Sequence, residues 1–276
     1  MTWRRLFALL GFALCTAALA GCDGDTLSLD PVASAANKTA EAESARITFR
    51  ATVTAGAVGA MEMSGRGIFD GRTKTGWMRM DYTLPPAAKA QLGSGSPSME
   101  MIFDGSDGIV MYMRSSMFDQ LGAGKWLKLD LEGLADREGI DLGALMNANQ
   151  ADPNQTLRML TASNGARVSG SDTIRGVKTT RYSFNVDLEK LADENEELSK
   201  SLEQLTGATG THSFPAEAWI DDQDRVRRLK LAMRMSTPAM GSMTMTMVED
   251  LYDFGVRAEI FPPAEADVID ISSLGG

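Results

Sequence analysis

The side chains that most often carry chemistry are scarce in this sequence of 276 residues. It holds one histidine, His212, and two cysteines, Cys15 and Cys22. One histidine excludes His-rich metal centres, and any Ser–His–Asp triad would have to use His212, for which no partner can be named. We interpret His212 as a surface loop residue. The sequence also lacks a pair of carboxylates with a defensible catalytic geometry. We therefore expect no enzyme activity, no cofactor and no metal site.

Cys22 follows a segment with the pattern of an export signal. Arg4 and Arg5 precede an apolar run over residues 6–20, which is shorter than the roughly 20 residues of a comfortable membrane span. The sequence Leu19-Ala20-Gly21-Cys22 resembles a bacterial lipobox, which implies diacylglyceryl transfer to the Cys22 sulfur and cleavage after Gly21. We therefore expect a signal peptide at 1–21, a lipidated tether at 22–33 and a protein held at the outer face of the cell membrane by its lipid.

Methionine is the most unusual component of the composition, with 18 residues. Most occur as Met-x-Met pairs in segments that alternate apolar and polar residues, and side chains two apart on a strand share a face. We expect one apolar interior to be lined by Met61, Met63, Met78, Met80, Met99, Met101, Met111, Met113, Met233, Met235, Met243, Met245 and Met247, with Leu198 and Leu202 covering it from a helix.

Three interpretations of these methionines remain open. They can simply pack a core, although β-branched residues are the usual choice in strands. Alternatively, they can line a deformable cavity for acyl chains, because an unbranched thioether adapts to variable apolar shapes. The third interpretation is capture of Cu(I) or Ag(I), which soft thioethers bind. We regard the metal interpretation as the least favoured, because the methionines alternate within strands and no histidine is near.

The elements that must position these residues are mostly strands. Period-two alternation begins near Ile47 and recurs near 61–69, 75–84, 98–103, 108–113, 125–131, 167–174, 177–187, 214–220, 225–236 and 242–254. Short links predict an antiparallel sheet of about eleven strands. Helices are expected over about 35–43, in short pieces within 132–162, and over 188–205, with Asp187 as the N-cap and Gly207 as the stop. We predict a single α+β domain over residues 34–276.

Several segments together resemble the actinobacterial LppX/LprG-type lipoproteins, which are related in fold to the LolA-like carriers. These segments are 44–49, 176–182, 218–221 with 225–229, and 252–255 before 261–264. The resemblance implies a strongly curved antiparallel half-barrel wrapped around helices, with a hydrophobic cavity between them. It also implies a lipid or glycolipid as ligand and, as a further partner, an envelope transporter or acceptor protein. Related folds serve as envelope sensors, so a sensor or interaction module with a filled core is the alternative function.

The charge balance argues against nucleic-acid binding. The chain has 37 acidic against 27 basic residues, a formal net charge of −10, and it has no block of lysine or arginine. A nucleic-acid partner would require a basic surface to neutralise phosphates. We therefore expect no nucleic-acid partner, and we assign membrane attachment to the lipid rather than to a basic patch.

Overall fold

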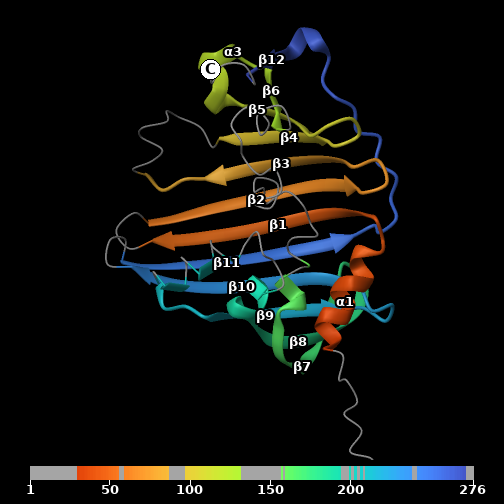
Figure 1. The fold of residues 1–276 in the computed structure, drawn as a ribbon, viewed down its shortest axis with the longest axis vertical. Helices are drawn as coiled ribbons and strands as arrows, with labels where there is room; N and C mark the ends of the chain where they lie inside the picture. The colour runs from red at the N-terminus through yellow and green to blue at the C-terminus, as the bar shows by residue number, and fades with distance from the viewer. Residues whose placement is uncertain are drawn as a thin grey trace, which may run out of the picture.

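One twelve-stranded sheet dominates the protein (Figure 1). The computed structural model describes residues 30–55, 59–86, 97–131, 157, 159–193, 199, 202–203, 206–207, 209–237 and 241–271. The strands are β1 (Ser44–Ala55), β2 (Gly59–Asp70), β3 (Thr75–Thr83), β4 (Ser98–Asp104), β5 (Val110–Ser115), β6 (Trp126–Asp130), β7 (Ser163–Ile174), β8 (Val177–Asp187), β9 (Ser213–Ile220), β10 (Val226–Thr237), β11 (Gly241–Tyr252) and β12 (Val268–Asp270).

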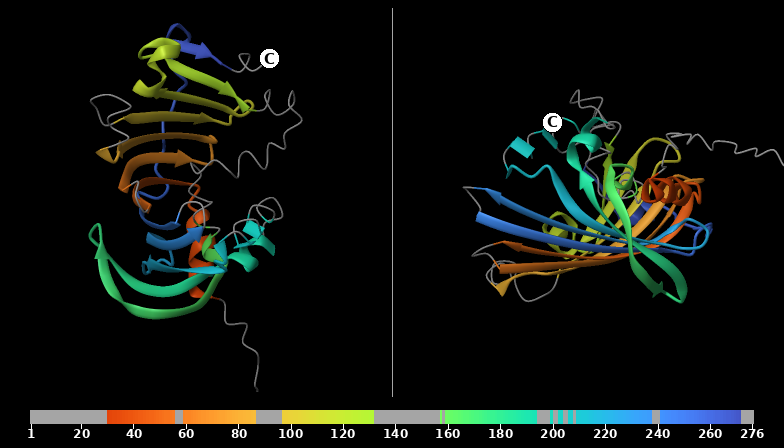
Figure 2. Two further views of the ribbon diagram at one scale, coloured as in Figure 1. Left: turned by 90° about the vertical axis from the view of Figure 1, so that its left-hand side faces the viewer. Right: turned by 90° about the horizontal axis from the view of Figure 1, so that it is seen from below.

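The sheet consists of two antiparallel meanders joined in the middle. The strand order is β12-β6-β5-β4-β3-β2-β1-β11-β10-β9-β8-β7. Pairing of β1 with β11 brings the first strand beside the penultimate one, orange next to blue in Figure 1. The two edges are β12 and β7, so the sheet is open, and its β7–β8 end curls around the side that carries the helices (Figure 2). This is the curved, mostly antiparallel sheet with helices on one side that the sequence predicted.

All eleven strands predicted from alternation are present, with ends within a few residues of the expected ones. The twelfth strand, β12, was missed. It contains only three residues and pairs with β6 in parallel, through Val268 with Trp126 and Ile269 with Leu127. A strand this short has too little alternation to be recognised, and its partner lies more than 130 positions earlier in the chain.

The first helix, α1 (Pro31–Ala40), begins four residues before the predicted start. Asp30 accepts hydrogen bonds from the backbone N–H groups of Val32 and Ala33, and Pro31 occupies the first turn, where its missing N–H costs nothing. The last residues of the expected tether are therefore helical. The division into signal peptide, tether and domain remains a prediction, since residues 1–29 lie outside the described part.

The predicted helix at 188–205 begins as expected. In α7 (Leu188–Asp193), Asp187 accepts hydrogen bonds from the backbone N–H groups of Glu189 and Lys190. The predicted stop at Gly207 is wrong, because residues 206, 207 and 209 are still helical. The remaining described helices are η2 (Ser116–Phe118), α3 (Asp119–Gly122) and η3 (Glu265–Asp267). Of the helices expected within 132–162, residues 157 and 159–161 are helical, and 132–156 lie outside the described residues.

The helices pack on one face of the sheet, which we call the inner face. Val32 and Ala35 of α1 and Leu188 and Leu191 of α7 are buried in one core cluster. The same cluster holds Leu157 and Leu160 together with residues of β8 to β11: Phe184, Val186, Phe214, Ala216, Ala218, Ile220, Val226, Leu229, Leu231 and Leu251. The described helical residues of this cluster therefore cover the inner face over the second meander.

Candidate ligand-binding face

The strand register places the methionines of the first meander in rows on the inner face. Directly paired residues of neighbouring strands point to the same side of a sheet. Met78 of β3 pairs with Met101 of β4, which pairs in turn with Met113 of β5. In the row on one side of these residues Met80 pairs with Met99, and in the row on the other side Met111 of β5 pairs with Phe103. Six of the thirteen predicted methionines therefore form one continuous apolar surface across three strands.

Small residues carry this surface across the centre of the sheet. Met78 and Met80 face Gly67 and Gly65 of β2, and Phe49 of β1 pairs with Gly65. A β-carbon at Gly65 would overlap the Phe49 ring, and one at Gly67 would lie 2.7 Å from the carbonyl oxygen of Trp77. These glycines leave room for the Phe49 ring and for close approach of β3 to β2.

The second meander continues the same face. Met63 and Met247 both pair with Ala51, and Met61 and Met245 both pair with Val53. Beyond β11, strand β10 contributes Met233, which pairs with Met245, and Met235, which pairs with Met243. All thirteen methionines therefore share the inner face.

The exposure of these methionines differs from that of the core cluster. Met111 is buried, at 6% exposure, whereas the other twelve are half-buried. Met233 and Met247 pack against the core cluster, and so does Leu202, the described member of the predicted helical pair. Leu198 lies outside the described residues. Half-buried thioethers on a shared face form an apolar surface that a ligand can contact.

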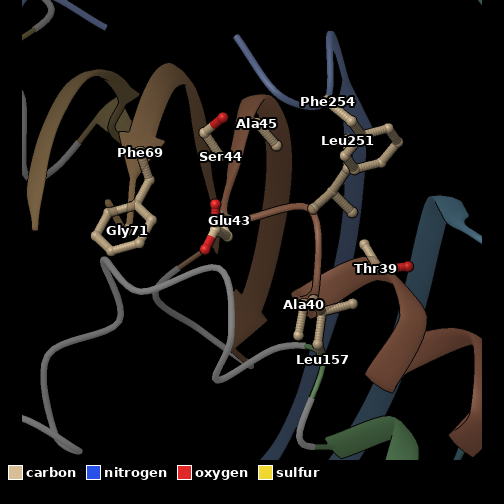
Figure 3. A pocket seen from close by; sticks show the side chains of 10 residues that line it. All are labelled: Thr39, Ala40, Glu43, Ser44, Ala45, Phe69, Gly71, Leu157, Leu251 and Phe254. Atoms are coloured by element: carbon tan, nitrogen blue, oxygen red, sulfur yellow. The ribbon is translucent and has the colours of Figure 1, made fainter. Parts of the chain in front are cut away.

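A pocket of about 230 Å³ opens where α1 meets this face (Figure 3). Ala45, Phe69 and Leu251 are inner-face residues of β1, β2 and β11, and the pocket continues the methionine surface at one end of the strands. Its remaining lining is mixed in polarity and comprises Thr39, Ala40, Glu43, Ser44, Gly71, Leu157 and Phe254. No sequence prediction included this pocket, because the helix end, the turns and the three strands that line it are distant in sequence.

An ion pair fixes the rim of the pocket. The Arg72 guanidinium donates to both oxygens of Asp70, at 2.8 and 2.7 Å, and also to Ser44 Oγ and to the Val256 carbonyl. The hydrogen bonds from Arg72 lower the pKa of Asp70 from 3.8 to about 2. The pair thereby ties the β2–β3 turn to the start of β1 and to the segment that follows β11.

Among the polar side chains on the inner face are Tyr82 and Glu249, and neither was predicted. Tyr82, which pairs with Met63, donates a hydrogen bond to the Met80 sulfur at 3.7 Å, and burial raises the pKa of its hydroxyl. Glu249 of β11 pairs with Phe49 on one side and with Leu229 on the other, and it is only 5% exposed. The signal for Glu249 was present in the sequence, because it alternates in phase with Met243, Met245 and Met247.

The opposite, outer face combines charged side chains with apolar ones such as Ile102 and Trp77. Glu100 accepts from Trp77 Nε1 at 2.9 Å and from Arg114 at 2.5 Å, and Arg114 also stacks on Trp126. Burial raises the pKa of Glu100, but the hydrogen bonds from Arg114 and Trp77 outweigh it and the net shift is downward. Alternation thus places charged groups such as Glu100 and Arg114 on the outer face, together with the buried Ile102 and Trp126.

The remaining candidate groups offer no reactive arrangement among the described residues. His212 is exposed, and its Nδ1 lies 3.0 Å from Glu189 Oε1. Within the described ranges, no group of three or more His, Cys, Asp or Glu side chains is placed to hold a metal ion. No described helix combines the length and the apolar character needed to cross a membrane. Cys22 lies outside the described residues.

Comparison with known proteins gives distant relatives. No family model matches the chain. A 31.2 kDa protein of Streptomyces griseus, encoded between rplA and rplJ, is 28% identical over 247 residues, which cover 86% of this chain and 77% of that protein. A Streptomyces coelicolor protein provisionally described as a lipoprotein is 26% identical over 249 residues, covering 90% of this chain and 76% of that one.

Solved structures similar to this chain include two mycobacterial proteins and a LolA-superfamily protein. LprF from Mycobacterium bovis has 13% identity and a TM-score of 0.47, covering 85% of this chain and 95% of its own. The Mycobacterium tuberculosis lipoprotein LppX has 10% identity and a TM-score of 0.35, with coverages of 83% and 98%. A LolA-superfamily protein from Nitrosomonas europaea has 8% identity and a TM-score of 0.28, with coverages of 83% and 93%. The architecture of this chain is defined by its own strand order and register, not by these similarities.

Proposed function

We propose that this protein is an exported lipoprotein that binds or shuttles a lipid or glycolipid on its inner, methionine-rich face. The observation that carries the proposal is the register, by which thirteen methionines from six strands share one face while twelve of them stay half-buried. The names of the Streptomyces coelicolor relative and of LppX support the lipoprotein part.

The chemistry of methionine favours a ligand with flexible chains. A thioether side chain has three rotatable bonds and a polarizable sulfur, so it can follow the contour of an acyl chain whose shape varies. Each methylene that leaves water contributes about 0.8 kcal/mol, and a few contacts per chain therefore give useful affinity. The face needs no charged lining for this kind of binding.

The proposed attachment to the membrane uses Cys22. A diacylglycerol on its sulfur would hold the N-terminus at the outer face of the cell membrane, and α1 begins only nine residues later. The inner face and its pocket adjoin α1, so the anchor would keep the site within a short tether of the lipid source. An envelope transporter or an acceptor protein would be the natural partner of such a carrier.

The alternative is a sensor or interaction module of the same fold with a filled core. Two observations favour it. Described helical residues already cover the inner face over β8 to β11, and the pocket beside α1, at about 230 Å³, is smaller than the 300–1,000 Å³ of ordinary ligand sites. A soft-metal chaperone has less support, since the methionines spread along rows across the sheet instead of converging on one point.

Extraction of the protein with its own lipid tests the proposal. The full-length chain is purified from its native membrane in a mild detergent and examined by native mass spectrometry. A bound lipid in addition to the N-terminal acyl groups supports carriage. A protein that carries only its anchor, and takes up no lipid from vesicles after delipidation, supports the filled-core module instead.

A further inference from the structure

The pocket beside α1 contains a charged side chain that the fold does not use. Glu43 lines this pocket at the end of the turn between α1 and β1, and it is exposed. In the view of Figure 3, its carboxylate lies between Phe69 and Leu251. Among the described residues, the Glu43 side chain makes no hydrogen bond and no ion pair. An exposed carboxylate is ionised at neutral pH, so Glu43 presents a negative charge to a group that enters the pocket.

The backbone fixes Glu43 at this place. Its φ of 59° lies in the left-handed region, which disfavours L side chains and usually selects glycine after a helix. Its carbonyl oxygen accepts a hydrogen bond from the Gly71 N–H at 2.6 Å, which ties the turn before β1 to the turn after β2. Glutamate therefore occupies a position where glycine would stabilise the fold, and contacts within the described structure do not account for it.

The other polar side chains of the lining are already engaged. Thr39 Oγ1 accepts from the Val226 N–H at 2.8 Å and donates to a carbonyl oxygen of its own helix at 2.6 Å. Ser44 is buried, and its Oγ accepts from Arg72 at 3.2 Å. Among the polar side chains of this lining, Glu43 is therefore the one that remains available to a ligand, and a carboxylate can only accept.

The cations near the pocket are held by other acids. Arg72 donates to both oxygens of Asp70, and its pKa is raised chiefly by Asp70 and to a smaller extent by Glu43. Two further guanidinium groups lie 4.8 Å from the centre of the Phe254 ring, and both pair with Asp221. Within the described structure, the charge of Glu43 is therefore not neutralised by an ion pair.

We propose, on the basis of the function above, that this pocket receives the polar end of the bound lipid and prefers a protonated amino group there. Ammonium N–H groups donate to a carboxylate in charge-assisted hydrogen bonds, whereas a phosphate or a carboxylate would meet Glu43 as a like charge. A volume of about 230 Å³ is too small for a whole lipid but has room for a small polar group. Ala45, Phe69 and Leu251 join the pocket to the methionine surface, where the chains would lie.

The test compares probes that share one alkyl chain and differ in the polar end. Delipidated full-length protein is loaded with N-phenyl-1-naphthylamine, which is displaced at neutral pH by dodecylamine, dodecanol or dodecanoate. Because an ion pair open to water contributes only modestly, the amine should bind about five-fold more tightly than the alcohol, and dodecanoate should bind more weakly than either. The preference should shrink as the ionic strength rises from about 0.01 M to about 0.15 M.

Variants distinguish Glu43 from the overall negative charge of the protein. Glu43→Gln should bind the amine and the alcohol nearly alike. Glu43→Gly should do the same, and since glycine suits the left-handed backbone, this variant keeps the test possible if the glutamine variant does not fold. Glu41→Gln, the same exchange two residues earlier and outside the pocket lining, should keep the preference for the amine.

The outcomes separate this inference from the proposed function. If the protein binds none of the probes and takes up no lipid from vesicles, the function itself is contradicted. If the unaltered protein binds the three probes equally, or if the preference for the amine persists in a folded Glu43 variant, lipid binding stands and the role of Glu43 is overturned. Equal loss of the preference in Glu41→Gln and Glu43→Gln also overturns it, because a general attraction of cations to an acidic protein then explains the result.

Discussion

Replacement of two inner-face methionines by glutamine should weaken lipid binding much more than it weakens the fold. Met101 lies between Met78 and Met113 in the first meander, and Met245 lies between Val53 and Met233 in the second. Both are half-buried. Glutamine has nearly the length of methionine, so the double change Met101→Gln and Met245→Gln alters polarity with little change in volume.

The magnitudes follow from that partial burial. Complete burial of a methionine contributes about 1.5–3 kcal/mol, so each half-buried side chain accounts for about 1 kcal/mol of folding free energy. A domain stable by about 5–15 kcal/mol remains folded after such a loss. A bound acyl chain would have to cover both amides, at a cost of about 1–3 kcal/mol each. Lipid affinity should therefore fall by about 30-fold or more.

The assay uses lipid transfer from vesicles for affinity and urea unfolding for stability. The matched control is the pair Glu62→Gln and Thr246→Gln, which places the same side chains on the exposed outer face of β2 and β11. That control should leave lipid transfer unchanged. Equal transfer by the inner-face pair and the unaltered protein, or equal losses in the two pairs, would refute the assignment of the inner face as the binding surface.

Four further predictions address anchor, metal, fold and pH. Cys22→Ser should release the protein from the membrane or leave its signal uncleaved in fractionation experiments, and retention of a correctly cleaved variant would exclude the lipid anchor. The folded protein should bind no Cu(I) with submicromolar affinity in a competition titration, because its methionines are spread along the sheet. Gly67→Ala should lower the free energy of unfolding, measured in urea, by about 1–3 kcal/mol, because the new β-carbon would lie 2.7 Å from the Trp77 carbonyl oxygen. Unchanged stability would contradict this close approach of β3 to β2. The pKa of Asp70 is about 2 in the folded protein against the ordinary 3.8, so its contribution to folding stability, at most about 2 kcal/mol, is present above pH 4 and lost as pH falls toward 2. In thermal melts over that pH range, Asp70→Asn should reduce the fall in stability with pH. An equal dependence of stability on pH in both proteins would argue against this role of Asp70.

Most of the sheet could be predicted because its strands carry the signal locally. Alternation in β1 to β11 reflects a mainly apolar inner face and an outer face that carries most of the charged residues, and this pattern needs no knowledge of the partner strands. The pairing of β1 with β11 and the parallel addition of β12 depend on contacts distant in sequence, which periodicity cannot report. The start of α1 was misplaced although its signal, Asp30 before Pro31, is local.

The site was partly predictable for the same reason. The shared face of the methionines follows from spacing, whereas the pocket between α1 and β1 arises from the tertiary packing of Thr39, Phe69 and Phe254. Glu249 could have been found as the charged residue in phase with three methionines. The role of Gly65 and Gly67 in accommodating Phe49 and the approach of β3 depends on the register, which spacing alone does not give.

Native mass spectrometry of the protein from its own membrane shows whether the inner face holds a lipid. If it does, a complex heavier than the acylated chain by the mass of one lipid is expected, and this species should be lost in the Met101→Gln and Met245→Gln variant. Lipid binding by the inner face is contradicted if the unaltered protein carries only its N-terminal acyl groups, before and after incubation with lipid vesicles.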